Sequence, residues 1–371
     1  SRRAARSSAE PASMRGWLAS ISLLTAPKLP LPRTNCLHGV TSAARWNSNR
    51  PKAKQSLGQN FLSDTTIARR VVEGLDDTLG TLRAGDDDGF RVIELGPGQG
   101  ALTGHLLATY PAMTAVEIDQ RMIEVLRESE ATAGLADLRE GDLLQLDFSR
   151  LAAEKGGRLS VISNTPFYLT SALLFKLLGA LDEVDRAVLT MQSEVADKVL
   201  APHGCKTYGP LAVMLQLFAA PTRLLEIPPQ AFKPQPKCCV TALRFHPSAT
   251  PAGRDAPLSA AQRTQLLALV KLTFEQRRKM LRQSLKRYLP NAATRPSDEL
   301  LSLRPEQLEP LHFVELAELL FGDDARGGGE AGLAAAHASA SWAPTKSGWL
   351  LKDKGPRELE TQGLERPGEV L

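Results

Sequence analysis

The sequence is poor in the residues that build metal sites and disulfide frameworks. Its 371 residues include four cysteines and six histidines. The cysteines have no C-x-x-C spacing and no paired histidines near them, which argues against a zinc site and against a disulfide-stapled scaffold. We therefore expect no metal. We interpret the adjacent Cys238 and Cys239 as small packing residues on a strand, facing opposite sides, in a reducing compartment.

Long apolar runs are also missing. None approaches the roughly 20 residues that cross a bilayer, so we expect a soluble protein with no membrane contact.

Acidic residues are scarce in one segment: residues 1–54 carry ten lysines or arginines and a single acid, Glu10, among many serines, alanines and prolines. This composition is typical of an organellar transit peptide, with mitochondrion slightly preferred over plastid. A disordered basic arm that touches RNA is the alternative. Imaging of this segment fused to a fluorescent reporter would show whether it directs the reporter to an organelle, and to which one.

Short strands and helices alternate along residues 55–247, which predicts an α/β domain built on a parallel sheet with helices on both faces. The expected strands are 91–95, 114–118, 138–141, 159–162, 187–191, 223–226 and 239–245. The expected helices are 65–75, with Ser63-Asp64 as its N-cap, 101–108, 121–128 and 171–181.

The C-terminal part differs in composition. Residues 246–257 are rich in Pro, Gly and Ser, which is typical of a linker. A long helix over 260–288 and another within 305–321 predict a smaller helical domain at 258–322. Residues 323–371 lack clear periodicity, and we expect this tail to be disordered.

A glycine-rich loop follows the first expected strand of the sheet. The spacing is Gly96-x-Gly98-x-Gly100, and Glu117 ends the next strand, where a carboxylate can hold a ribose diol. Alone, the loop would suit NAD or S-adenosylmethionine. Ala101 stands where the dinucleotide pattern has its third glycine, which favours S-adenosylmethionine. Asp142, at the end of the third strand, can accept from an adenine amino group, although a turn or cap role is the alternative.

The segment Asn164-Thr165-Pro166-Phe167 ends the fourth strand and should open into the same crevice. An amide oxygen and a backbone carbonyl there could hold both N–H groups of an exocyclic amine and point its lone pair at a sulfonium methyl. Pro166 would fix the turn, and Phe167 could stack on a flipped base. The alternative is a capped turn with Phe167 in the core.

A cluster of cations lies between residues 271 and 287, with one acid, Glu275, among them. Such a run favours contact with RNA phosphates and a salt-sensitive affinity. An ordinary solvated helix face is the alternative. The candidate RNA-binding residues are Lys271, Arg277, Arg278, Lys279, Arg282 and Lys286.

These features together resemble the KsgA-type ribosomal RNA adenine dimethyltransferases, including their organellar members. The resemblance covers residues from about 55 to 321. Its motifs are LGQNFL (57–62), ELGPG (94–98), VEID (116–119), GD (141–142), NTPF (164–167), FKPQPK (232–237) and QRRKMLR (276–282). The order of these motifs is specific, whereas any one of them is weak.

The resemblance implies a Rossmann-like methyltransferase domain with a helical RNA-binding domain. It implies N6,N6-dimethylation of two adjacent adenosines in the 3′-terminal hairpin of small-subunit ribosomal RNA, with a role in ribosome biogenesis. We expect a monomer that meets the pre-ribosomal small subunit. The family usually has leucine where this chain has Thr165, and Tyr168 replaces a commonly small polar residue.

The resemblance also assigns residues to roles. It implies that the cofactor, S-adenosylmethionine, is bound by Asn60, Leu62, Gly96, Glu117, Asp142 and Asn164, with Gly98 in the same glycine loop. It implies that Asn164 and Phe167 handle the target adenine in the turn made by Pro166, and that Phe232 provides a second aromatic wall.

Two other classes of function compete with this interpretation. A non-catalytic organellar assembly or transcription factor could keep the fold, but the intact Asn164, Phe167 and Glu117 argue against complete loss of activity. A small-molecule or NAD-dependent enzyme is disfavoured by the cation cluster and by the glycine spacing. The cofactor that stabilises the protein against heat would distinguish this last class.

Overall fold

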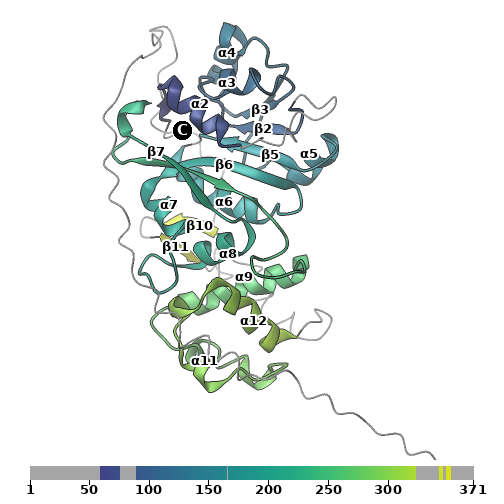
Figure 1. The fold of residues 1–371 in the computed structure, drawn as a ribbon, viewed down its shortest axis with the longest axis vertical. Coiled ribbons are helices and arrows are strands. Elements are labelled where there is room, and N and C mark those ends of the chain that lie inside the picture. The colour runs from purple at the N-terminus through teal and green to yellow at the C-terminus, as the bar shows by residue number, and fades with distance from the viewer. Residues whose placement is uncertain (1–58, 76–88, 165, 323–341, 346–347, 352–371) are drawn as a thin grey trace, which may run out of the picture. The chain divides into compact units, whose positions relative to one another are not determined.

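The computed structural model describes residues 59–75, 89–164 and 166–322, together with the backbone of two strands at 342–345 and 348–351 (Figure 1). The basic segment 1–54, expected to be a transit peptide, and Thr165 lie outside the described residues. Most of the tail expected to be disordered does so too. Two strands within that tail, β10 (Trp342–Thr345) and β11 (Gly348–Leu351), depart from the expectation because their backbones pair antiparallel.

A seven-stranded sheet forms the centre of the fold, in the order β4-β3-β2-β5-β6-β9-β7. The five strands from β4 to β6 are parallel, and β9 runs antiparallel to both β6 and β7. The α/β class predicted from the alternation of elements is confirmed, with an antiparallel addition at one edge. The strands are β2 (Val92–Leu95), β3 (Thr114–Glu117), β4 (Asp137–Glu140), β5 (Leu159–Ser163), β6 (Val184–Gln192), β7 (Thr222–Ile227) and β9 (Val240–Phe245).

Helices cover both faces of this sheet (Figure 1). One face packs against α2 (Thr65–Glu73) and α3 (Thr103–Leu107), and α4 (Gln120–Glu128) follows β3. The other face packs against α5 (Phe148–Glu154), α6 (Thr170–Leu178), α7 (Ser193–Val199) and α8 (Pro210–Phe218). The predicted N-cap of α2 is confirmed: the carboxylate of Asp64 accepts from the N–H groups of Thr66 and Ile67 at 2.9 and 3.0 Å.

The two faces are separated residue by residue along each strand. In β2, Val92 belongs to the core cluster under α2 and α3, whereas Ile93 and Leu95 belong to the cluster under α5 to α8. In β5, Val161 and Ile162 divide in the same way. Side chains alternate in a strand, and burial on both faces explains why these strands are mostly apolar; the exceptions, Glu94, Ser160 and Ser163, are buried as well.

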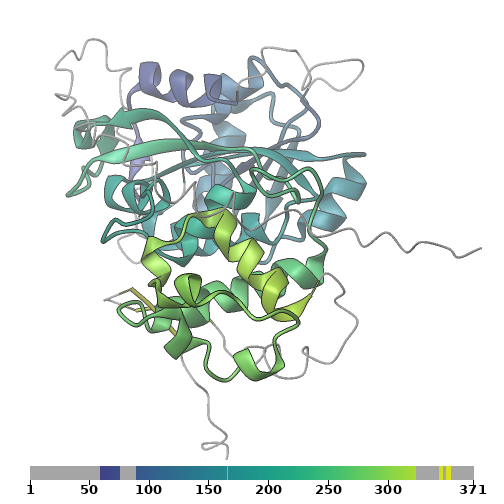
Figure 2. The same ribbon diagram turned by 60° about the horizontal axis from the view of Figure 1, so that its bottom comes forward.

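The C-terminal helices are α9 (Ala260–Glu275), α10 (Leu281–Ser284), α11 (Asp298–Ser302) and α12 (Pro310–Phe321). Helices α9 and α12 pack side by side (Figure 2). Tyr208 connects this part to the chain before it, because its hydroxyl donates to the carbonyl of Leu308 at 3.0 Å and its ring meets Phe274 edge-on. The predicted domain division near residues 247–258 stays a prediction.

The predicted continuous helix over 260–288 is wrong. Helix α9 ends at Glu275, and Met280 is extended before α10 begins. Tertiary bonds replace helical ones at the break: Arg277 pairs with Glu306 at 2.6 Å, and the N–H of Leu281 donates to the carbonyl of Leu303 at 2.8 Å. Helical spacing in the sequence cannot reveal such distant partners.

The expected linker is held against the end of α8. The N–H groups of His246, Ser248 and Ala252 donate to the carbonyls of Ala219, Phe218 and Leu217. These bonds satisfy carbonyl groups that a helix end leaves without partners. Among the helices in the described part of the chain, none is long and apolar enough to cross a bilayer.

Candidate functional site

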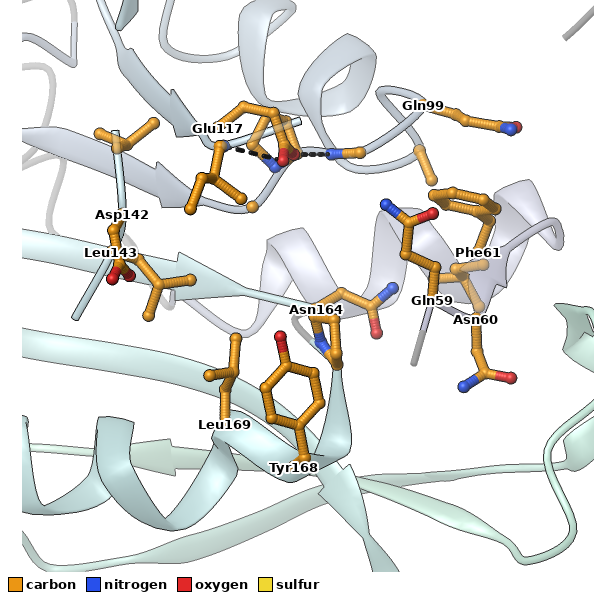
Figure 3. Close-up of a pocket in the computed structure, with 18 of the residues that line it drawn as sticks. Gln59, Asn60, Phe61, Gln99, Glu117, Asp142, Leu143, Asn164, Tyr168 and Leu169 are labelled. Carbon is orange, nitrogen blue, oxygen red and sulfur yellow. Dashed lines mark hydrogen bonds between the residues drawn. The ribbon is translucent and has the colours of Figure 1, made fainter. Parts of the chain in front are cut away.

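A cavity of about 310 Å³ opens at the carboxyl ends of β2, β3 and β5 (Figure 3). The strand order reverses between β2 and β5, since β3 and β4 continue from one side and β6 from the other. Ligands of parallel α/β sheets bind at such a reversal, where the loops diverge. The volume lies within the range of about 300–1,000 Å³ that is typical of small-molecule pockets.

The structure brings together all the residues predicted to bind a cofactor. The cavity is lined by Asn60, Leu62, Gly96, Gly98, Glu117, Asp142 and Asn164. These seven residues come from five separate segments of the chain, so their meeting depends on the strand order.

The glycine loop curls around the carboxylate of Glu117. One oxygen of Glu117 accepts from the N–H of Gly98 at 2.9 Å, and the other accepts from the N–H groups of Ile118 and Asp119, each at 2.9 Å. Gly98 has a φ of +53°, and a Cβ there would lie 3.1 Å from the ring of Phe61. The loop therefore needs glycine at 98 both for its backbone conformation and for the close approach of Phe61.

Two acidic side chains are buried beneath this loop. Burial raises the pKa of Glu117, although its three backbone N–H donors oppose the rise. Glu94, on β2, is 1% exposed and accepts from the hydroxyl of Thr103 at 2.7 Å. Burial raises the pKa of Glu94 to about 8, the hydroxyl of Thr103 opposes this, and the negative charge of Glu117 adds to it. Burial thus favours the protonated form of Glu94 far above the pH range in which a carboxyl group usually ionises.

Asp142 lies at the cavity wall and also closes a turn, so the turn role weighed from the sequence is confirmed, whereas a contact with an adenine amino group stays a prediction. It lines the cavity, and its carboxylate also accepts from the N–H of Leu144 at 2.8 Å, which closes a turn after β4. Lys176, on α6, steadies the same turn by donating to the carbonyl of Leu144 at 3.0 Å. One oxygen of Asp142 accepts the hydrogen bond that closes the turn, and this bond keeps the carboxylate at the cavity wall.

Asn164 lies directly after β5, at the edge of the cavity and between the Tyr168 ring and the Gln59–Phe61 segment (Figure 3). Its amide oxygen accepts from the hydroxyl of Thr190, on β6, at 2.6 Å. The preceding Ser163 donates to the carbonyl of Leu95 at 2.8 Å, which ties the end of β5 to the end of β2.

The two phenylalanines predicted to hold a base are not part of this cavity lining. Phe167 is partly buried and packs against the core cluster under α2 and α3, and Phe232 is 2% exposed in the same cluster. Pro166 does line the cavity, and so does Tyr168, which is 56% exposed. The packing of Phe167 matches the alternative weighed from the sequence. A contact of Phe167 or Phe232 with a base stays a prediction.

Several lining residues were not singled out in the sequence analysis. Gln59 and Phe61 reach the cavity because β1 (Phe61–Leu62) pairs antiparallel with β8 (Phe232–Lys233) and because the Gln59 amide donates to Asp119 at 3.2 Å. Ile118 lines the cavity with 58% of its surface exposed. Its place directly after Glu117 at a strand end was a signal that could have found it.

The predicted RNA-binding residues divide into two groups. Arg278, Lys279, Arg282 and Lys286 are exposed in the turn before α10 and around α10. Arg277 instead pairs with Glu306 and donates to the carbonyl of Cys205. Lys271 is partly buried with its ammonium 5.9 Å from the Phe175 ring centre, and burial lowers its pKa. Only the first group is exposed to solvent, and within it Arg282 also donates to the sulfur of Met280 at 2.8 Å.

Comparison with known proteins places this geometry in context. The model of the family described as "Ribosomal RNA adenine dimethylase" matches residues 50–308. A ribosomal RNA small subunit methyltransferase A from Salinibacter ruber is 44% identical over 271 residues, covering 72% of this chain and 85% of that protein. A protein of the same name from Acinetobacter baylyi is 36% identical over 267 residues, covering 72% and 92%. Among solved structures, a dimethyladenosine transferase from Plasmodium falciparum shares the fold, with a TM-score of 0.54 at 21% identity over 69% of this chain and 95% of that one.

Proposed function

The chain belongs to the ribosomal RNA adenine dimethylase family, and we propose that it transfers methyl groups from S-adenosylmethionine to the N6 atom of adenosine in small-subunit ribosomal RNA. The observation that carries this proposal is the convergence of Glu117, Asp142 and Asn164 on one cavity beside the glycine loop. The names of the relatives support the RNA substrate. Two adjacent adenosines in the 3′-terminal hairpin are the finer form of the proposal.

The cavity suits S-adenosylmethionine in its chemistry. Glu117 presents a carboxylate suited to ribose hydroxyls, Asp142 one suited to an adenine amino group, and Ile118 and Leu143 supply apolar surface for the adenine ring. The loop at Gly98 has no room for a Cβ on the Phe61 side. When bound, this cofactor supplies an electrophilic methyl group on sulfur.

We propose that Asn164 activates the amine. The lone pair of an adenine N6 is delocalised into the ring, and an amide oxygen that accepts an N6–H favours a more tetrahedral nitrogen with a localised lone pair. Glu117, Asp142 and the glycine loop would hold the cofactor, whose sulfonium methyl would be the group transferred, and the amine held by Asn164 would give up one proton to water in exchange. Positioning and polar contacts of this kind lower the barrier without a strong base.

The test combines the purified protein, S-adenosylmethionine and small ribosomal subunits that lack the modification. We expect N6,N6-dimethyladenosine by mass spectrometry of the digested RNA. Glu117→Ala is the negative control: the cofactor should no longer stabilise this variant against heat, and the variant should form no dimethyladenosine. Cofactor binding by the wild type without any dimethyladenosine would refute the proposal. Rescue of ribosome assembly in cells by Glu117→Ala would instead support a non-catalytic assembly factor.

We propose that Arg278, Lys279, Arg282 and Lys286 contact RNA phosphates, because they are exposed cations without ion pairs in the described part of the chain. Each alanine substitution should weaken RNA binding and lower the slope of log affinity against log salt by about one. Binding titrations at several salt concentrations measure this slope. Arg295→Ala, which removes an exposed arginine beside Asp298, is the control. An unchanged slope in the Lys279→Ala and Arg282→Ala variants would exclude phosphate contact by these two residues.

We also propose that residues 1–54 direct the protein to an organelle, with mitochondrion preferred over plastid. The support is their composition, ten basic residues against one acid. A cytosolic or nuclear signal from the reporter fusion would contradict this proposal.

A further inference from the structure

Thr190 is a buried polar residue that touches the proposed catalytic amide from outside the cavity. It lies on β6, is 2% exposed and is not among the lining residues. Its hydroxyl donates to Asn164 Oδ1 at 2.6 Å. Within the described part of the chain, this bond is the one hydrogen bond made by either side chain.

The sheet holds Thr190 more firmly than it holds Asn164. In the parallel pair of β5 and β6, Ser163 lies opposite Leu189, so Asn164 and Thr190 are the next residues on the same face of the sheet. Strand β5 ends at Ser163, whereas β6 continues to Gln192 and pairs Thr190 with Ala242 of β9. Thr190 is thus fixed by the ladder on one side, and Asn164 stands at the start of a loop.

The hydrogen-bonding capacity of the two groups favours one orientation of the amide. Asn164 Oδ1 has two lone pairs, and the Thr190 hydroxyl has a single hydrogen to donate. If the amide turned by 180°, the buried hydroxyl of Thr190 would have to give its hydrogen to another acceptor. A buried donor left without a partner costs about 1–3 kcal/mol. The observed orientation keeps one lone pair of Oδ1 for Thr190 and leaves the other for a substrate.

We propose that Thr190 is a positioning residue, which sets the rotamer of the Asn164 amide so that Oδ1 meets the amine of the target base. The inference rests on the proposed function and deepens it. Thr190 does not contact the substrate itself, and it acts by reducing the number of orientations that Asn164 samples before the methyl transfer.

The experiment compares Thr190→Val, which keeps the branched shape and removes the hydroxyl, with Thr190→Ser, which keeps the hydroxyl. Groups that orient metal ligands offer a comparison: their loss lowers metal affinity or activity by about 10–100-fold. We therefore expect Thr190→Val to lower the single-turnover rate at saturating cofactor and RNA about tenfold, while the dissociation constants for both stay within about twofold. Thr190→Ser should recover most of the rate.

Asn164→Ala provides a test that a merely structural role would not pass. In that background Thr190→Val should cause no further loss, because the group that it orients is gone. A wild-type rate in Thr190→Val would overturn the inference. Equal loss in Thr190→Ser, or an equal loss from Thr190→Val with and without Asn164, would overturn it too.

A second measurement does not depend on activity. The side-chain amide signals of Asn164 in a 1H–15N spectrum are the pair that disappears in Asn164→Ala. We expect this pair to shift or broaden in Thr190→Val and to stay in place in Thr190→Ser, whereas an unchanged pair in Thr190→Val contradicts the inference. If the wild type bound cofactor but methylated no RNA, the proposed function would fail, and these signals would still decide whether Thr190 orients Asn164.

Discussion

Asn164→Ala should lower the rate of methyl transfer by about 10²–10³-fold at saturating cofactor and RNA. The substitution removes the side-chain amide that lines the cavity directly after the end of β5. Without it, the amine of the target base keeps its lone pair delocalised, and its orientation toward the methyl group is no longer held. Saturating both substrates separates this loss from any weakening of cofactor binding.

The measurement is single-turnover incorporation of labelled methyl groups, with thermal unfolding as the check on folding. Asn291→Ala is the matched control, since Asn291 is an exposed asparagine in a short 3-10 turn near α10. The control should methylate at the wild-type rate. A folded Asn164→Ala protein with wild-type turnover would show that the amide does not position the amine.

Glu94→Gln should remove a large part of the pH dependence of stability between about pH 4.5 and 8. The folded state raises the pKa of Glu94 from 4.5 to about 8, so across this window the folded protein holds a proton that the unfolded chain releases. The favourable contribution of the protonated carboxyl is complete below the unfolded pKa and is lost as pH rises through the folded one. For one proton, the free energy of unfolding should fall by roughly 1.4 kcal/mol per pH unit.

Denaturant unfolding at pH 5, 7 and 9 tests this in wild type and variant. Glutamine keeps an oxygen for the Thr103 hydroxyl and cannot ionise. The free energy of unfolding of the wild type should therefore fall relative to that of the variant as pH rises. Glu128→Gln, which neutralises an exposed carboxylate on α4, should leave the slope unchanged. A difference between the two unfolding free energies that is the same at pH 5, 7 and 9 would mean that Glu94 is already ionised in the fold.

Much of the cofactor cavity could be predicted because its residues sit at strand ends. Apolar runs that stop at Gly96, Glu117 or Asn164 mark the carboxyl ends of strands, and parallel strands present those ends at one edge. Asn60 and Leu62 were found in a different way, from the resemblance of the motif around them. Their local sequence says nothing of the β1–β8 pairing that brings them to the cavity.

The features that were missed depend on partners far away in the chain. The cation cluster was predicted on one long helix, but Glu306 and Leu303 compete for groups that would have continued α9. Phe167 and Tyr168 are adjacent aromatics, but Phe167 is partly buried against the core cluster under α2 and α3, whereas Tyr168 lines the cavity. Propensity and spacing are equal for both, so tertiary contacts decide between them.

The sequence by itself determined the strands of the central sheet and their order along the chain, the glycine loop with its acidic partner, and the polar residues at the strand ends. These follow from periods and spacings that span a few residues. Only the tertiary structure decided three things: where the edge strands lie in the sheet, how side chains beyond the strand ends are oriented, and that Asn164 and Thr190 form a hydrogen bond. Those depend on which strands become neighbours. The pairing of strands is stabilised by burial of the whole core, so it cannot be inferred from a short window of sequence.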